Sequence, residues 1–124
     1  PIIDRGPGAE GGWRPLVAYL ESVGRLRAMD VDLVLPGHAV PFGNHRRIID
    51  DLGRFYEKRQ ARIRAALERG PLSGWEITRA LFPSAPAKAL FLTASEAIGN
   101  VEVLESRGEV ARALEGGVQK FRLA

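Results

Sequence analysis

Apolar residues at helical spacing mark the first element of the chain. Leu16, Leu20 and Val23 lie on one side of a helix predicted over residues 13–29. Pro15 suits its opening turn, because that position needs no backbone N–H donor. The apolar, partly β-branched run at 31–35 then predicts a short buried strand.

A long amphipathic helix is predicted from Asn44 to Arg69. Asn44 is a plausible N-cap, and Gly70-Pro71 supplies a glycine past the last turn followed by a residue that cannot continue the helix. The positions expected to face inward are Ile48, Leu52, Phe55, Tyr56, Ile63, Ala66 and Leu67.

The remainder predicts two more helices and a hairpin. Ser73 and Glu76 have the spacing of a capping box and open a short helix that ends before Pro83. The next helix runs from Pro86 to about Arg107. Strand-like runs flank Gly116-Gly117, a turn typical of a β-hairpin. The inward face expected for the 86–107 helix is Leu90, Phe91, Ala94, Ile98, Val101 and Leu104. Helix, short helix, helix and hairpin in this order are typical of a winged helix.

Composition narrows the class of protein. The 124 residues are 45% hydrophobic and 27% charged, which fits one globular domain or two small ones. The absence of cysteine excludes disulfides and thiolate metal sites. We find no apolar run of about 18 residues and no signal peptide, so we expect a cytoplasmic protein without a membrane partner. A chain that begins Pro1-Ile2-Ile3 reads as part of a longer protein.

The positive charge is concentrated in one segment. Residues 43–70 hold eight basic and four acidic side chains, whereas the flanking segments are nearly balanced. Five cations fall on the side of the long helix opposite its apolar stripe: Arg47, Arg54, Lys58, Arg62 and Arg69. This side is either a solvated face with local ion pairs or a surface that attracts an anionic substrate, such as a coenzyme A thioester or RNA. Arg54, Lys58 and Arg62 are the candidate substrate-binding residues.

Sequence-specific DNA binding is not expected. The 86–107 helix carries little positive charge, and Asn100 is its one side chain suited to reading bases. Stacking on bases needs exposed aromatic rings beside basic residues. We expect packing in the core or at a domain junction instead for Trp13, Trp75, Phe91 and Phe121, and packing or a pocket wall for Phe42 and Phe82.

The two histidines differ in their surroundings. His38 follows the predicted strand on a Pro-Gly loop, which suits either a metal ligand or a loop histidine that contacts solvent or a carbonyl. His45 lies in the first turn of the long helix, where we expect a solvated surface residue.

Several ordered segments carry a family resemblance. They are the amphipathic stretch 16–26, the loop Leu35-Pro36-Gly37-His38 with Pro41 after it, the arginine-bearing helix with Arg59, the runs 70–73 and 76–77, and the run 104–110. Together they resemble the C-terminal end of a metallo-β-lactamase-fold hydrolase of the subgroup that carries a winged-helix tail, the β-lactamase-like protein 2 type.

The resemblance implies a fold and two domains. The fold would be α+β and mainly α: residues 1–43 would end the metallo-β-lactamase αββα domain, and residues 44–124 would form the winged-helix tail of three helices and a β-hairpin wing. Cut from its sandwich, the 31–35 strand would favour pairing with another chain or with a retained part of the protein.

The resemblance also implies a metal site. His38 would be the last ligand of a two-zinc centre, in which metal hydroxide attacks an ester, thioester, lactam or phosphodiester. The upstream cluster His-x-His-x-Asp-His, a further histidine and a bridging aspartate are absent, and Asp4 is not assigned that bridging role. A catalytic zinc needs about three protein ligands. We therefore expect this chain alone to hold no zinc tightly and to be inert, with no catalytic residue of its own.

The expected partners follow from the same resemblance. They are the missing N-terminal part of the protein and a small-molecule or RNA substrate, with a homo-oligomer possible. A different hypothesis makes the chain a free-standing winged-helix module that binds nucleic acid or a protein.

Overall fold

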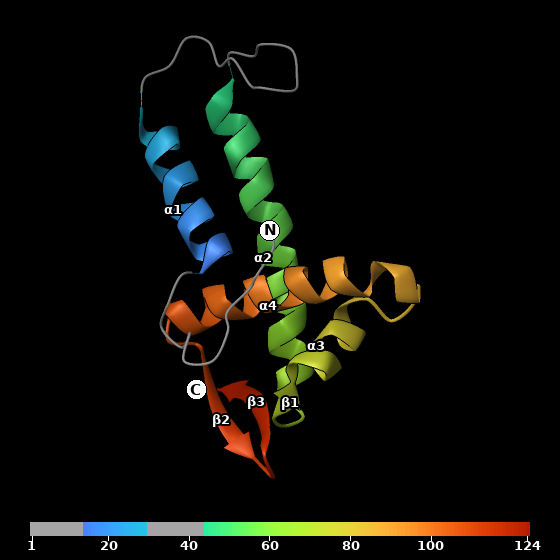
Figure 1. Cartoon of the computed structure of the whole chain (residues 1–124). Coiled ribbons are helices and arrows are strands. Elements are labelled where there is room, and N and C mark those ends of the chain that lie inside the picture. Colours follow the sequence, from blue (N-terminus) through green and yellow to red (C-terminus); the bar gives the residue numbers. More distant parts are fainter. Residues whose placement is uncertain (1–13, 30–43) are drawn as a thin grey trace.

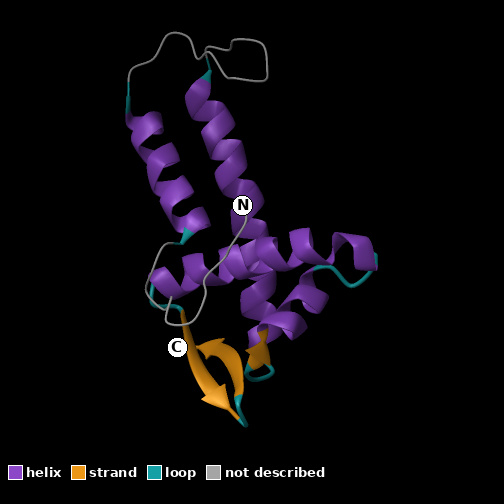
Figure 2. Cartoon of the chain, in the orientation of Figure 1, coloured by secondary structure: helices purple, strands orange, loops and turns teal. Residues whose placement is uncertain are grey.

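The computed structural model describes residues 14–29 and 44–124, and within them the protein is α+β and mainly helical, as predicted (Figures 1 and 2). The predicted strand at 31–35 lies outside the described residues. The elements are α1 (Pro15–Ala28), α2 (His45–Leu67), β1 (Leu72–Ser73), α3 (Gly74–Leu81), the 3-10 turn η1 (Ala87–Ala89), α4 (Leu90–Ser106), β2 (Val110–Glu115) and β3 (Val118–Leu123).

One apolar core joins the C-terminal half of α2 to α3, α4 and the sheet. Ile63, Ile77 and Leu104 are completely buried at its centre, and Phe121 of β3 closes it from the sheet side. The other members are Leu67, Leu81, Ala97, Val101 and Val110. Figure 1 shows α4 crossing α2 here, with α3 and the strands below the crossing.

The sheet has three antiparallel strands in the order β1-β3-β2. Its hairpin turns at Gly116 and Gly117, whose φ angles of 61° and 81° suit glycine and confirm the predicted two-residue turn. Strand β1 was not predicted. It is two residues long and exists through its pairing with β3, where Leu72 lies opposite Phe121.

The two predicted N-caps have different outcomes. Ser73 accepts a hydrogen bond from the Glu76 backbone, and the Glu76 carboxylate accepts one from the Ser73 backbone, so the capping box is confirmed. Asn44 occupies the N-cap position of α2, but its side chain makes no capping hydrogen bond. The predicted N-cap position of Asn44 is therefore confirmed, without a hydrogen bond from its side chain.

The predicted apolar faces of α2 and α4 extend too far toward the N-terminus of each helix. Ile48, Phe55, Leu90 and Phe91 are all exposed, with Phe91 58% exposed. Their spacing is helical, but the N-terminal parts of both helices project past the crossing that forms the core (Figure 1). Periodicity identifies a face of a helix, and the packing partners decide how much of that face is covered.

Helix α1 packs beside α2 and reaches α4 at its lower end (Figure 1). Leu16 lies so close to Gly99 of α4 that a Cβ on the glycine would be 3.3 Å from the leucine side chain. Arg14 donates to Glu105 at 3.0 Å, and Arg112 of β2 holds the same carboxylate with two bonds of 2.6 and 2.7 Å. Helix α1, the C-terminal end of α4 and the sheet are thus joined at one carboxylate.

Candidate functional site

The predicted metal ligand His38 lies outside the described residues. Within residues 14–29 and 44–124 no group of three or more His, Asp or Glu side chains could hold a metal ion. The described part of the chain therefore does not by itself build the zinc site that the resemblance implies.

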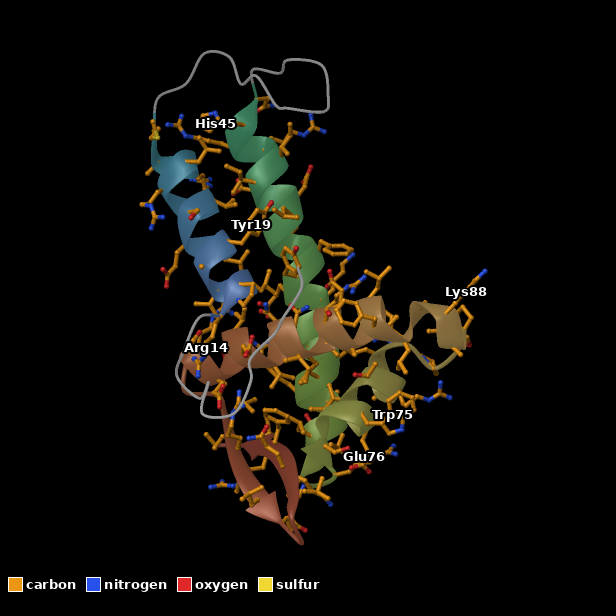
Figure 3. All side chains as sticks on the ribbon, viewed as in Figure 1. Arg14, Tyr19, His45, Trp75, Glu76 and Lys88 are labelled. Atoms are coloured by element: carbon orange, nitrogen blue, oxygen red, sulfur yellow. The ribbon has the colours of Figure 1, made fainter. Side chains whose placement is uncertain are left out.

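His45 is buried, and the prediction of a solvated surface position is wrong. It is 4% exposed and its Nε2 donates to the carbonyl oxygen of Met29 at 3.0 Å. Arg46 donates to the same carbonyl and to that of Arg27. The first turn of α2 thus holds the C-terminal carbonyls of α1, where helix carbonyls lack partners of their own (Figure 3).

The three candidate substrate-binding residues of α2 have different surroundings. Arg62 reaches across to the end of α3 and donates to the Leu81 carbonyl at 2.8 Å. Arg54 forms an ion pair with Asp51 one turn away. Lys58 is exposed and makes no ion pair within the described part of the chain. Arg62 is therefore held by the fold, Arg54 is partly neutralised, and Lys58 is left to solvent.

A shallow groove runs between α1 and α2 beside Arg54. Its walls are Leu20, Val23, Gly24, Ile49, Asp50, Leu52, Gly53, Arg54 and Glu57. Asp50 bonds Arg27 of α1 at 2.6 Å, and this hydrogen bond holds the pKa of the Asp50 carboxyl below its ordinary value. Since Asp50 and Glu57 line the groove together with Arg54, its charge does not select an anion.

Several other basic residues of this region stabilise the fold. Arg64 bonds Glu57 and Glu109, and its hydrogen bonds hold the pKa of Glu109 below the ordinary value. Arg59 bonds Glu96 of α4 at 3.1 Å and lies over the Phe82 ring. Phe82 thus packs under an arginine and also lines a small cavity between α3 and α4.

Asn100 of α4 is unavailable for reading bases. It is completely buried, accepts a hydrogen bond from Gln60 at 3.3 Å, and donates to the Glu96 carbonyl at 2.9 Å. Gln60 in turn accepts from Arg107. The polar side chain that sequence analysis singled out on this helix is part of its packing against α2.

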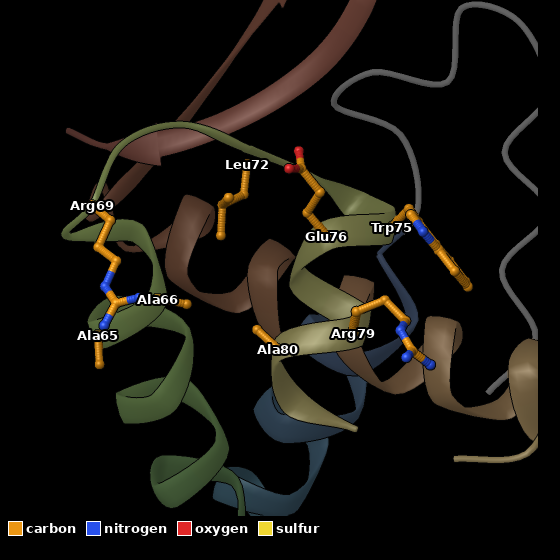
Figure 4. Close-up of a pocket in the computed structure, with 8 residues that line it drawn as sticks. All are labelled: Ala65, Ala66, Arg69, Leu72, Trp75, Glu76, Arg79 and Ala80. Carbon is orange, nitrogen blue, oxygen red and sulfur yellow. The ribbon is translucent and has the colours of Figure 1, made fainter. Parts of the chain in front are cut away.

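A groove lies between the end of α2 and α3, and sequence analysis did not find it. Figure 4 shows Arg69 on one wall, Trp75 and Arg79 on the other, and alanines between them. Trp75 is 54% exposed and Phe91 58%, so neither packs in the core, and the alternative of packing at a domain junction stays a prediction. Phe121 does pack in the core, whereas Trp13 and Phe42 lie outside the described residues.

Within the described part of the chain, no helix is long and apolar enough to cross a membrane.

The solved structures most informative here are metallo-β-lactamase proteins. A β-lactamase domain protein from Burkholderia ambifaria is 32% identical and superposes with a TM-score of 0.75, covering 90% of this chain and 34% of that one. A metallo-β-lactamase family protein from Thermus thermophilus is 27% identical with a TM-score of 0.65, covering 88% of this chain and 34% of that one.

The curated relative is described as a probable metallo-hydrolase. The probable metallo-hydrolase YqjP of Bacillus subtilis is 30% identical over 122 residues, which are 98% of this chain and 38% of YqjP. No family model matches the chain. The predicted resemblance to metallo-β-lactamase-fold hydrolases is confirmed, and the chain spans about a third of the length of the relatives it matches.

The similarity to YqjP extends over both predicted parts of the chain, residues 1–43 and residues 44–124. A match over 98% of its length includes α1 and the sequence Pro36-Gly37-His38 as well as the helices and hairpin that follow. The comparisons therefore favour part of a hydrolase over a free-standing winged-helix module.

Proposed function

We propose that this chain is the C-terminal portion of a metal-dependent hydrolase of the metallo-β-lactamase superfamily, acting in the cytoplasm on an ester, thioester, lactam or phosphodiester. The observation that carries the proposal is the similarity, at 30 to 32% identity over nine-tenths or more of the chain, to a metallo-hydrolase and a β-lactamase domain protein.

The metal centre would depend on residues beyond this chain. His38 would contribute one ligand to a site for two zinc ions, and the other ligands would come from the N-terminal part of the same protein. Because a catalytic zinc needs about three protein ligands and the resemblance assigns His38 alone, we infer that this chain alone binds no zinc tightly and is catalytically inert.

Residues 1–43 would complete the catalytic domain, and residues 44–124 would form a winged-helix tail. The order α2, β1, α3, α4, β2, β3 and the strand order β1-β3-β2 support the winged-helix assignment. Its role would be to pack against the catalytic domain and to position a small-molecule or RNA substrate, for which exposed Lys58 is the strongest of the three candidates. A homo-oligomer is compatible with this role.

The proposal is tested in the longer natural protein with the variant His38→Ala. We expect loss of one bound zinc ion and at least about a 100-fold fall in kcat, because loss of even an outer partner of a metal ligand costs 10- to 100-fold. The assays are zinc content by mass spectrometry and hydrolysis of chromogenic ester, thioester, lactam and phosphodiester substrates.

His45→Ala is the matched control, because the structure places His45 between α1 and α2. It should lower thermal stability and leave zinc content unchanged. Full zinc content and activity in His38→Ala would overturn the assignment of His38.

A further inference from the structure

The groove between α2 and α3 combines an apolar floor with basic walls. It encloses about 660 Å³, a size typical of ligand sites. Ala65 and Ala66 of α2, Leu72 of β1 and Ala80 of α3 form the apolar lining. The small side chains leave room for a ligand to approach the backbone of both helices (Figure 4).

Two arginines line opposite walls of this groove without a carboxylate partner. Neither Arg69 nor Arg79 forms an ion pair within the described part of the chain. Glu76 is the one carboxylate among the eight lining residues, and it accepts the backbone N–H of Ser73 at 2.9 Å. That hydrogen bond lowers the pKa of Glu76, which stays charged, so the lining carries a net charge of +1.

The basic surface continues along α2 away from the groove. Lys58 and Arg62 are four residues apart and so lie on one side of the helix, and Arg69 follows in the turn after its last residue, Leu67. None of the three forms an ion pair with a carboxylate within the described residues, and Arg62 is held by backbone carbonyls that leave its charge in place.

Trp75 supplies an aromatic surface at the rim of the groove. The guanidinium carbon of Arg79 lies 5.8 Å from the centre of the indole ring, which orders both side chains. More than half of Trp75 is still open to solvent. An exposed ring beside basic residues meets the physical requirement for stacking on a nucleobase.

We propose that this groove binds a nucleotide unit, with its base stacked on Trp75 beside Arg79 and its phosphate at Arg69 on the opposite wall. Arginine suits this role because its planar guanidinium donates two parallel hydrogen bonds to phosphate oxygens. The row formed by Lys58 and Arg62 would take the phosphates of neighbouring nucleotides when the unit is part of a single strand. The inference does not depend on the hydrolase proposal, and the two can fail separately.

The test is binding to the full 124-residue chain, measured by calorimetry and by the indole N–H signal of Trp75. The probes are ADP and a single-stranded oligoadenylate of about twelve nucleotides, within the range that one single-strand binding site covers, with polyglutamate as an acidic chain that lacks bases. We expect both nucleotide probes to bind. Trp75→Ala should weaken the binding of both about tenfold, because one stacked base contributes about 1–3 kcal/mol, roughly five- to 150-fold in affinity. Trp75→Phe should keep most of the affinity, because it keeps an aromatic ring.

Charge-matched double variants separate the groove from general attraction. Arg69→Gln with Arg79→Gln should weaken both nucleotide probes at least about tenfold, since each charge-assisted bond to phosphate contributes about 1.5–3 kcal/mol. Arg47→Gln with Lys88→Gln removes the same charge from exposed positions outside the groove and should change binding little. The arginine pair keeps the test decisive if Trp75→Ala fails to fold.

Two further outcomes identify the source of the nucleotide, and three would overturn the site. If Lys58→Gln weakens binding of the oligoadenylate alone, the ligand of the groove is a single strand. If ADP and the oligoadenylate bind with equal affinity, the ligand is a free nucleotide. Equal loss in both double variants, polyglutamate binding as tight as that of the oligonucleotide, or no binding of either nucleotide at millimolar concentration would each refute it.

Discussion

The lower module and the helical arm of this protein are held by different forces. The lower module consists of the C-terminal half of α2 with α3, α4 and the sheet, and its centre is completely buried apolar side chains such as Ile63 and Leu104. The arm consists of α1 and the N-terminal half of α2. Helix α1 buries only Pro15 and Leu16 among its fourteen residues, and no α1 residue belongs to the core cluster.

Polar contacts largely replace the missing core in the arm. The Arg27–Asp50 ion pair and the hydrogen bonds that His45 and Arg46 donate to α1 carbonyls connect its two helices. Exposed ion pairs add little to stability. The arm meanwhile leaves Tyr19, Met29, Ile48 and Phe55 exposed. This difference fits a lower module that needs no further contacts to bury its core. It also fits an arm whose exposed apolar side chains are covered by the rest of a larger protein, as proposed above.

The largest expected effect is in the core of the lower module. Leu104→Ala should lower the free energy of unfolding by about 2–5 kcal/mol, because it removes completely buried methyl groups and leaves a cavity. Leu20→Ala in the arm should cost less than half as much, since Leu20 is only partly buried. Urea titration measures both, and equal losses would contradict the contrast between the two regions.

The contact between Leu16 and Gly99 should detach the arm without unfolding the lower module. Gly99→Leu would force Leu16 out of its position, and overpacking of this kind costs about 1–3 kcal/mol. Hydrogen exchange should accelerate in α1 and stay slow in α3. Gly53→Leu is the control, because a Cβ there meets nothing within 4 Å and helix propensity favours the change. Uniform acceleration in both helices would show that arm and module unfold together.

The capping box of α3 should make a smaller contribution to the lower module. Ser73→Ala removes the acceptor for the Glu76 backbone N–H and should cost about 1 kcal/mol. Thermal unfolding followed by circular dichroism gives the change, and Ser22→Ala on the exposed surface of α1 is the control. A loss no greater than that of the control would count against the cap.

The smallest effect is the pH dependence of the Arg64–Glu109 pair. The folded-state pKa of Glu109 lies below its unfolded value, so the pair's contribution is present above about pH 4.5 and disappears as the pH falls through the folded-state value. Since the carboxylate is partly exposed, we expect less than about 1 kcal/mol. Glu109→Gln should flatten the acid limb of the stability curve, and an unchanged limb would exclude this pair as its source.

Local signals in the sequence were sufficient where neighbours along the chain decide the structure. Ser73 with Glu76 and the Gly116-Gly117 turn were predictable because their partners lie within three residues. Strand β1 was not, because its two residues become a strand only beside β3. The exposure of Trp75 and the burial of His45 depend on which helices cross nearby, and the α2–α3 groove joins residues from both sides of the Gly70 turn.

The central claim is that this chain is one part of a metal-dependent hydrolase and supplies too few ligands to hold zinc alone. Calorimetric titration of the isolated 124-residue chain with zinc tests it most directly. We predict no site tighter than micromolar, because a catalytic zinc needs about three protein ligands and the resemblance assigns His38 alone. A one-to-one site of nanomolar affinity would contradict the account.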